Sequence, residues 1–375
     1  MIKSLVVIAA LLVTASHVFA QSDETMTVAS GGFSRTMLIH WPMDNPPANL
    51  PLLFCFHGTG GSSEGIRNQT AFNALADQYG FIVVYPQALR IGNDVQWNVY
   101  VDGAPGHGGI ANASDAPDDL MFVKEVIASF VSRNGIDTNR VFATGMSNGG
   151  FMSYALSILA DRQVRAIAPV AANMWGSESF LNTIVGSGTL RTMPVMHVHG
   201  TADGVVPYVD SDNQPKSYEE YPLFVPSRVC GSTTYTSVVP IMAGVDKLVF
   251  CGPPTEVSLI RITGMGHTWS NGVYQTSREI VRFFGLDLPS AAPDETGGSV
   301  RFMSANPVGD IIQLELDEPA TIELIASDGS AAYRAHHDRG RVAIDARSMA
   351  SGSYLLRAHG ATASSTFSAL VVVVH

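Results

Sequence analysis

A serine between glycines follows an apolar run near the middle of the chain. The segment reads Gly145-Met146-Ser147-Asn148-Gly149, directly after the residues "RVFA". A strand that reverses into a helix within a few residues needs backbone angles at which a Cβ would clash, and glycines relieve that clash. The serine at the apex then exposes its hydroxyl above the sheet edge. We predict that Ser147 is a nucleophile; an ordinary small-residue turn is the alternative.

Two further residues supply what a serine nucleophile needs. Asp203 follows the apolar run "MPVMHVHG", and His267 follows "EVSLIRITG". A serine hydroxyl is a poor nucleophile until an imidazole takes its proton, and a carboxylate on the other ring nitrogen fixes the tautomer of that imidazole. We therefore predict His267 as the general base and Asp203 as the acid that orients it.

A glycine-rich segment after the run "LPLLFCF" could bind a developing oxyanion. It begins at His57 and continues as Gly-Thr-Gly-Gly. Flexible loops of this kind can aim backbone N–H groups at the oxyanion of a tetrahedral intermediate. We expect one donor from Asn148 and a second from Thr59 or Gly60. We expect His57 to orient this loop rather than to transfer a proton.

Other polar residues have a structural interpretation. Asp115, Asp118 and Asp119 precede a helical stretch, where capping is the expected role. His197 and His199 are alternate residues of a strand and share a face, which would suit a metal pair. No further His or Asp cluster completes a ligand shell, so neither a metal nor a cofactor is predicted.

Three tryptophans lie in segments that follow predicted strands: Trp97, Trp175 and Trp269. Aromatic rings at such positions could form a wall that binds substrate, and we predict this role for them. Packing inside the protein is the alternative.

Short apolar runs alternate with helical stretches between Thr25 and Leu288. The runs are rich in Val, Ile and Phe, and most end in a glycine or proline, as strands do. The alternation predicts an α/β fold, with a mostly parallel sheet and helices on both faces. Reactive groups gather at the carboxyl ends of the strands in such a sheet. The expected strands are "RTMLIHW", "LPLLFCFHG", "GFIVVYPQA", "RVFATG", "VRAIAPVAA", "MPVMHVHG" and "EVSLIRITG"; the expected helices are "TAFNALADQY", "DDLMFVKEVIASFVSR", "GGFMSYALSILADR" and "SREIVRFFG".

Composition and the N-terminus limit the binding partners and the cellular location that we expect. The chain has a formal net charge of −11 and no basic cluster, which argues against nucleic-acid binding. Residues 1–20 show a lysine, an apolar stretch and a small-residue cleavage site, as a secretory signal peptide does. No later run is long enough to span a bilayer, so we expect an exported protein without a membrane span.

Export would place the three cysteines in an oxidising compartment, where disulfides can form. Cys230 and Cys251 lie in one segment, and an oxidising compartment favours their pairing as a disulfide. Cys55 lies within an apolar strand and is expected to be a buried free thiol.

The composition changes after Leu288. Residues 289–299 are rich in proline, glycine and small residues and are expected to be a linker. Residues 300–375 show short alternating strands without a helical pattern, which predicts a small β-sandwich. The catalytic domain is accordingly expected to span residues 21–288.

The segments "GMSNGG", "HGTADGVVPY", "GMGHTWS", "FIVVYPQA" and "QWN" together resemble the secreted feruloyl esterase and poly(3-hydroxybutyrate) depolymerase-like group of α/β-hydrolases. The resemblance covers roughly residues 32–288. It implies an α/β-hydrolase fold and a serine carboxylic-ester hydrolase that acts on polymer-linked esters. The substrate that the resemblance implies is a feruloyl or acetyl ester of a polysaccharide, or a hydroxyalkanoate polyester. By the same resemblance, Ser147, Asp203 and His267 match the triad, and Cys230 and Cys251 match a cysteine pair.

The C-terminal segments "NPVGD", "ATIELIASDGS" and "IDARSMASGSYLLR" resemble the sorting domain of the bacterial type IX secretion system. This resemblance implies a secretion-machinery partner and a secreted or cell-surface protein. A carbohydrate- or polymer-binding sandwich is the alternative for this segment. For the whole chain, a serine peptidase of the prolyl-oligopeptidase type and a non-catalytic surface binding protein are the alternatives.

Overall fold

The computed structural model describes residues 22–43, 46–99, 117–159, 163–173, 193–208, 231–232, 234–252, 255–272, 274–287, 300–302, 311–326, 330–349, 352–360 and 366–373. The predicted signal peptide, linker, Trp175 and Cys230 lie outside these residues. Within them, no helix is long and apolar enough to cross a membrane.

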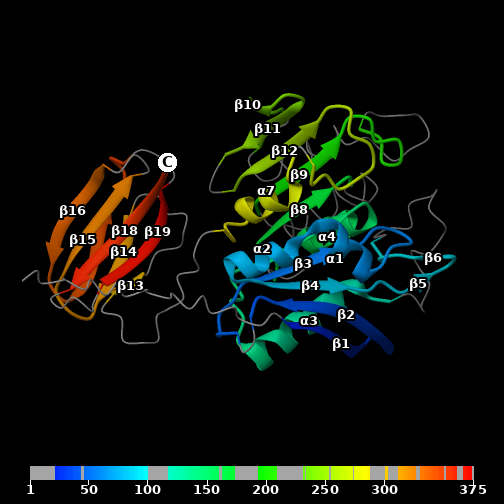
Figure 1. Ribbon diagram of the computed structural model, residues 1–375, viewed down its shortest axis with the longest axis horizontal. Helices are drawn as coiled ribbons and strands as arrows, with labels where there is room; N and C mark the ends of the chain where they lie inside the picture. The colour runs from blue at the N-terminus through cyan, green and yellow to red at the C-terminus, as the bar shows by residue number, and fades with distance from the viewer. Residues whose placement is uncertain are drawn as a thin grey trace, which may run out of the picture.

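A ten-stranded mixed sheet forms the centre of the larger part of the chain (Figure 1). Its strand order is β1-β2-β4-β3-β7-β8-β9-β12-β11-β10. The neighbours from β4 to β12 in this order are parallel, and the outer strands are antiparallel. The strands are β1 (Ser22–Ser30), β2 (Phe33–Trp41), β3 (Leu52–Phe56), β4 (Ile82–Pro86), β7 (Val141–Met146), β8 (Ala166–Val170), β9 (Val195–Gly200), β10 (Ser237–Met242), β11 (Val245–Cys251) and β12 (Val257–Ile262); a separate two-stranded ribbon pairs β5 (Arg90–Ile91) with β6 (Asp94–Val95).

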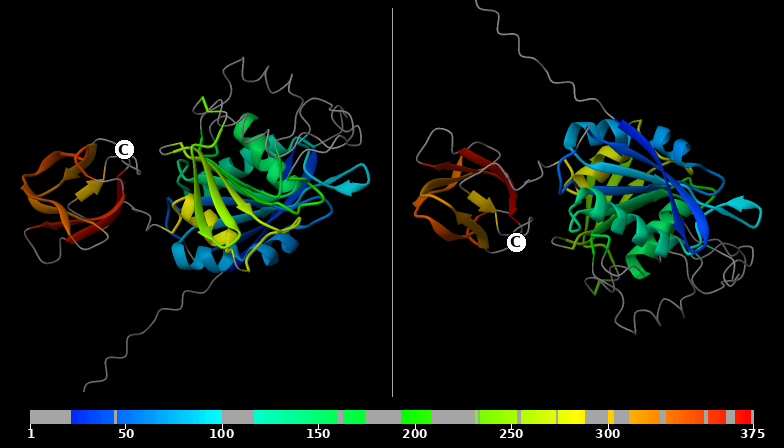
Figure 2. Two further views of the ribbon diagram at one scale, coloured as in Figure 1. Left: turned by 90° about the horizontal axis from the view of Figure 1, so that it is seen from above. Right: turned by 90° about the horizontal axis from the view of Figure 1, so that it is seen from below.

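Helices cover both faces of this sheet, as Figure 2 shows. Leu52, Phe54 and Phe56 of β3 belong to one core with the helices α3 and α4, whereas Leu53 and Cys55 belong to a second core with α1, α2 and α7. Alternate residues of a strand point to opposite faces, so a central strand buried on both sides has no polar face. The helices are α1 (Ser63–Thr70), α2 (Phe72–Tyr79), α3 (Asp119–Asn134), α4 (Asn148–Leu159) and α7 (Thr276–Phe283).

The sequence prediction of an α/β fold is confirmed, and each of the seven strands and four helices expected from the pattern has a counterpart. Of the three aspartates with an expected capping role, Asp115 lies outside the described residues, and the other two have different partners. Asp118 caps α3, accepting a hydrogen bond from the N–H of Met121 at 2.8 Å. Asp119 is instead a buried partner of the Arg35 guanidinium, at 2.5 Å.

The C-terminal part forms two antiparallel sheets around a core of their own. One sheet has the order β13-β14-β17 and the other β16-β15-β18-β19. Both contribute apolar side chains to a single cluster, as a sandwich does. The strands are β13 (Val300–Phe302), β14 (Ile311–Leu316), β15 (Ala320–Ala326), β16 (Ala331–His337), β17 (Gly340–Asp345), β18 (Gly352–Gly360) and β19 (Thr366–Val373).

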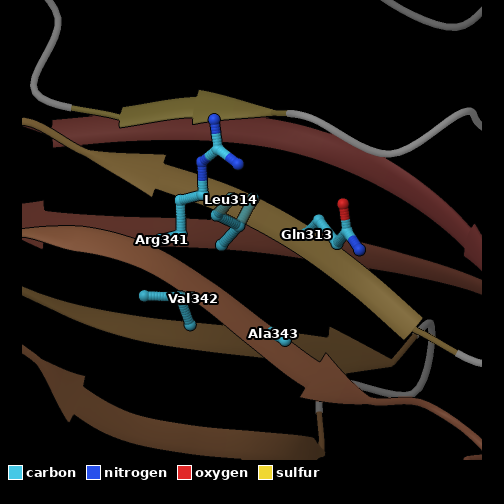
Figure 3. Close-up of a pocket in the computed structure, with 5 residues that line it drawn as sticks. All are labelled: Gln313, Leu314, Arg341, Val342 and Ala343. Atoms are coloured by element: carbon cyan, nitrogen blue, oxygen red, sulfur yellow. The ribbon is translucent and has the colours of Figure 1, made fainter.

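A pocket lies on β14 and β17 of this sandwich (Figure 3). None of the predicted catalytic residues comes from these strands, so this pocket is not the candidate active site. Its lining consists of Gln313, Leu314, Arg341, Val342 and Ala343.

Candidate active site

Ser147 occupies a strained turn between β7 and α4. Its φ of +55° lies in the left-handed region that residues with a side chain rarely adopt. The surrounding backbone holds it there: its N–H donates to the carbonyl of Val170 at 2.9 Å, and its carbonyl accepts from Gly150 at 2.8 Å. This is the backbone that a serine needs to stand exposed at the end of a strand.

The glycines of the turn allow two strands and a helix to approach closely. A Cβ on Gly149 would overlap the carbonyl of Phe56 on β3, and a Cβ on Gly145 would lie 2.7 Å from the same oxygen. Gly150 lies against Ala172, which follows β8. The glycine pattern read from the sequence therefore has a steric cause, because α4 packs directly on the strands that flank the serine.

Asp203 and His267 form a hydrogen-bonded pair. Nδ1 of His267 lies 2.8 Å from Oδ2 of Asp203. Asp203 follows β9 and His267 follows β12, and these two strands are parallel neighbours. The carboxylate is fully buried, whereas the imidazole is 16% exposed. Because β7 is parallel to the same strands, Ser147, Asp203 and His267 all follow carboxyl ends at one edge of the sheet.

Asp203 is stabilised as a carboxylate. Burial raises its pKa, but hydrogen bonds from His199, His267 and the N–H groups of Val206 and Val205 outweigh burial and place the pKa below the usual range. The two N–H groups donate to Oδ1 at 2.9 Å each. An ionised carboxylate on Nδ1 leaves Nε2 of His267 as the nitrogen that can accept a proton.

Of the two residues that could supply the donor expected from the glycine-rich loop, Thr59 and Gly60, one has its N–H engaged elsewhere. The N–H of Gly60 donates to the carbonyl of Val95 at 2.8 Å, so the prediction of Gly60 as an oxyanion donor is wrong. The N–H groups of Thr59 and Asn148 have no acceptor among the described residues. Thr59 and Asn148 are therefore the available pair.

His57 orients this loop. Its Nε2 accepts the backbone N–H of Ala88 at 3.1 Å, so its proton lies on Nδ1, which donates to the carbonyl of Gly58 at 2.7 Å. Burial lowers the pKa of His57, in opposition to the hydrogen bond to Gly58, and this favours the neutral ring. Both nitrogens are engaged, which agrees with the expected orienting role.

Two of the three tryptophans predicted to bind substrate, Trp97 and Trp269, are described, and both are packing residues. The indole N–H of Trp97 donates to the carbonyl of His57 at 2.8 Å, and that of Trp269 donates to Oγ of Ser277 at 3.0 Å. Trp97 is fully buried and Trp269 is 5% exposed. The prediction that these two rings line a substrate surface is wrong, because neither presents a face to solvent.

The described cysteines agree with the sequence expectation. Cys55 is free and buried, and Cys251 is disulfide-bonded. The pairing of Cys251 with Cys230 stays a prediction, because Cys230 lies outside the described residues.

Sequence reasoning missed two contacts beside the site. Oδ1 of Asn148 accepts the backbone N–H of Trp97 at 2.6 Å, which ties the nucleophile turn to the segment after β6. His199 lies 3.3 Å from Oδ2 of Asp203, and its Nδ1 lies 3.0 Å from Nε2 of His197. Within the described part of the chain, no group of three His, Cys, Asp or Glu residues could hold a metal.

Known proteins resemble this chain in both sequence and fold. The family described as "Esterase PHB depolymerase" matches residues 39–225. A bifunctional acetylxylan esterase/xylanase of Neocallimastix patriciarum is 27% identical over 72% of this chain and 36% of that protein. Feruloyl esterase B of Talaromyces funiculosus is 24% identical over 62% of this chain and 69% of that protein.

The fold has a solved counterpart. The acetyl xylan esterase of Aspergillus awamori superposes with a TM-score of 0.55 at 18% identity, over 71% of this chain and 99% of that one.

The chain spans only about a third of the length of the Neocallimastix relative. The chain therefore has the α/β-hydrolase fold. The relatives named above are esterases.

Proposed function

We propose that this protein is an exported serine esterase that removes acetyl or feruloyl groups from a polysaccharide, with Ser147, His267 and Asp203 as its triad. The observation that carries the proposal is the left-handed backbone of Ser147 at the same sheet edge as the hydrogen-bonded His267–Asp203 pair. A strained serine and an oriented imidazole are the two parts that acyl transfer requires.

The proposed reaction has two halves. Oγ of Ser147 attacks the ester carbonyl while Nε2 of His267 takes the hydroxyl proton, and the negative oxygen is stabilised by the N–H groups of Thr59 and Asn148. His267 then gives that proton to the leaving alcohol, and an acyl-enzyme remains on Ser147. Water attacks the acyl-enzyme with His267 again as the base, which releases the acid and restores the serine. Asp203 keeps its negative charge and stabilises the imidazolium in both halves.

The substrate class is proposed from the relatives. The Neocallimastix and Talaromyces proteins are named as an acetylxylan esterase and a feruloyl esterase, which favours an acyl group carried on a polysaccharide. The matched family is described as a polyhydroxybutyrate depolymerase, which favours a hydroxyalkanoate polyester as the second candidate.

A panel of substrates tests this assignment. Turnover would be measured on acetylated xylan, methyl ferulate, hydroxybutyrate oligomers and a peptide amide. The proposal predicts the highest kcat/KM on acetylated xylan or methyl ferulate. Preferential cleavage of the oligomers would transfer the assignment to the polyester. Hydrolysis of the amide alone would support the prolyl-oligopeptidase alternative.

Export and the role of the C-terminal sandwich are proposals on sequence grounds alone. If the sandwich is a sorting domain, a chain that ends at Leu288 keeps its rate on a small soluble ester but stays in the periplasm of its host. If the sandwich is a binding module, export persists and only activity on insoluble polymer falls. Cell fractionation together with an insoluble-substrate assay separates the two.

A further inference from the structure

A row of buried polar side chains lies behind Asp203. The hydroxyl of Tyr154 on α4 is 2.6 Å from Nδ1 of His197 on β9, and Nε2 of His197 is 3.0 Å from Nδ1 of His199. Nε2 of His199 lies 3.3 Å from Oδ2 of Asp203, the same oxygen that faces His267. Tyr154, His197 and His199 are each 2% exposed or less.

The proton positions in this row follow from its last acceptor. Nε2 of His199 is also 2.9 Å from the carbonyl of Val206, and neither a carbonyl nor a carboxylate can donate, so this nitrogen carries the proton. The hydroxyl of Tyr154 donates to Nδ1 of His197, so the single proton of the neutral His197 ring lies on Nε2. That N–H donates to Nδ1 of His199. Every donor in the row therefore meets an acceptor, and the last N–H, that of His199, faces both the carbonyl of Val206 at 2.9 Å and Oδ2 of Asp203 at 3.3 Å.

Burial keeps His197 and Tyr154 neutral. It lowers the pKa of His197 well below the ordinary histidine value, and the nearby His199 lowers it further. Burial also raises the pKa of Tyr154, so the phenol keeps its proton. Fully satisfied buried networks of this kind are rigid, because any other arrangement leaves a buried polar group without a partner.

The row also connects two parts of the candidate site. Tyr154 lies on α4, the helix that starts one residue after Ser147, whereas His197 and His199 lie on β9, which leads to Asp203. The helix of the nucleophile is thus bonded through side chains to the strand of the acid.

We propose that Tyr154, His197 and His199 are positioning residues, which hold Oδ2 of Asp203 in line with Nδ1 of His267. The proposal rests on the triad assigned above. If the proposal is correct, substitutions that break this row of hydrogen bonds lower kcat, because His267 is then oriented less well. KM stays close to the wild-type value.

Kinetics of four variants test the proposal. Tyr154→Phe removes one hydroxyl and keeps the ring, and we expect kcat to fall about three- to tenfold. His199→Leu removes the donor to Asp203, and we expect a fall of about ten- to a hundredfold. His199→Gln restores an N–H near the position of Nε2, and we expect it to recover most of the loss.

Tyr85→Phe is the matched control. Tyr85 is also a buried tyrosine, and its hydroxyl donates to Oδ1 of Asn73 at 2.7 Å, away from the row. We expect it to lower stability to a similar extent but to leave kcat unchanged. A folded Tyr154→Phe protein with wild-type kcat would overturn the proposal, and so would equal losses of kcat in Tyr154→Phe and Tyr85→Phe.

Nitrogen NMR of histidine-labelled protein gives a second test that does not depend on turnover. We expect His197 and His199 both to carry their proton on Nε2, and His57 to carry it on Nδ1 as an internal reference of the opposite tautomer. A proton on Nδ1 of His197 would contradict the row even if the triad is correct. Failure of a phosphonate probe to label Ser147 would contradict the triad, whatever the tautomers are.

Discussion

Gly58 lies directly against the proposed nucleophile. A Cβ at position 58 would be 3.2 Å from Cβ of Ser147 and 3.3 Å from the carbonyl of Met146. The candidate oxyanion loop and the turn of Ser147 are therefore in contact at a position where a Cβ would be closer than ordinary van der Waals distance to both neighbours.

Replacement of Gly58 should impair catalysis because of this contact. We expect Gly58→Ala to lower kcat at least about tenfold on a soluble ester, since the loop and Ser147 must move apart and one oxyanion donor alone contributes about 3 kcal/mol. Gly272→Ala is the control, because a Cβ there would meet no described residue within 4 Å. Equal activity of the two variants in a p-nitrophenyl acetate assay would rule out the tight contact.

The ionisation of Asp203 predicts a pH dependence of stability. Its pKa is lower in the folded protein than in the unfolded chain. The carboxylate therefore contributes stability that is fully present above about pH 4, the ordinary aspartate value, and is lost as the pH falls below it.

Urea unfolding of the wild type and of Asp203→Asn between pH 2 and pH 6 measures this contribution. The difference between their free energies of unfolding should shrink by more than about 1 kcal/mol toward pH 2, because one pKa unit corresponds to about 1.4 kcal/mol. Other carboxylates titrate in both proteins and cancel. A difference that does not change with pH would contradict the lowered pKa.

The Arg35–Asp119 pair predicts a large effect on stability. Both side chains are buried, and the guanidinium also lies 4.0 Å from the ring centroid of Phe122. Arg35→Met leaves the Asp119 carboxylate without its counter-ion, and we expect a loss of about 3–5 kcal/mol in the free energy of unfolding.

Arg133→Met is the control for that measurement. Arg133 pairs with Glu24 at 3.3 Å at the surface, where an ion pair is typically worth about 1 kcal/mol or less. Similar losses in the two variants, measured by urea denaturation, would show that burial does not set the cost.

The disulfide gives a chemical prediction. Mass spectrometry of the unreduced protein should find Cys230 joined to Cys251, with Cys55 as the free thiol. Burial raises the pKa of Cys55, so its thiol should resist alkylation until the protein unfolds. Reduction should cost about 2–4 kcal/mol of stability. Rapid alkylation of Cys55 in the native protein would be inconsistent with its burial.

The local patterns predicted the parts of the structure that depend on neighbouring residues. The turn around Ser147 could be predicted from its glycines, and the parallel strands could be predicted from their apolar runs. The helix α1 escaped prediction because its sequence, SEGIRNQT, offers no apolar period. The strand β10, with the sequence SVVPIM, escaped prediction because its proline interrupts a short apolar run.

The contacts that the sequence did not predict are between residues far apart in the chain. Tyr154 and His197 are 43 positions apart, and Arg35 and Asp119 are 84 apart. The hydrogen bond from the N–H of Gly60 to the carbonyl of Val95 also joins residues far apart in the chain. Tryptophans after strands look alike in sequence whether they are exposed or buried, so Trp97 and Trp269 could be assigned only from their surroundings.

Covalent trapping of the nucleophile tests the central claim most directly. The protein would be treated with a fluorophosphonate, digested and mapped by mass spectrometry, in parallel with Ser147→Ala and His267→Ala. The account predicts one adduct on Ser147 in the wild type, none in Ser147→Ala, and labelling slowed at least about a hundredfold in His267→Ala. An adduct on another residue, or a folded Ser147→Ala protein that hydrolyses esters at the wild-type rate, would contradict it.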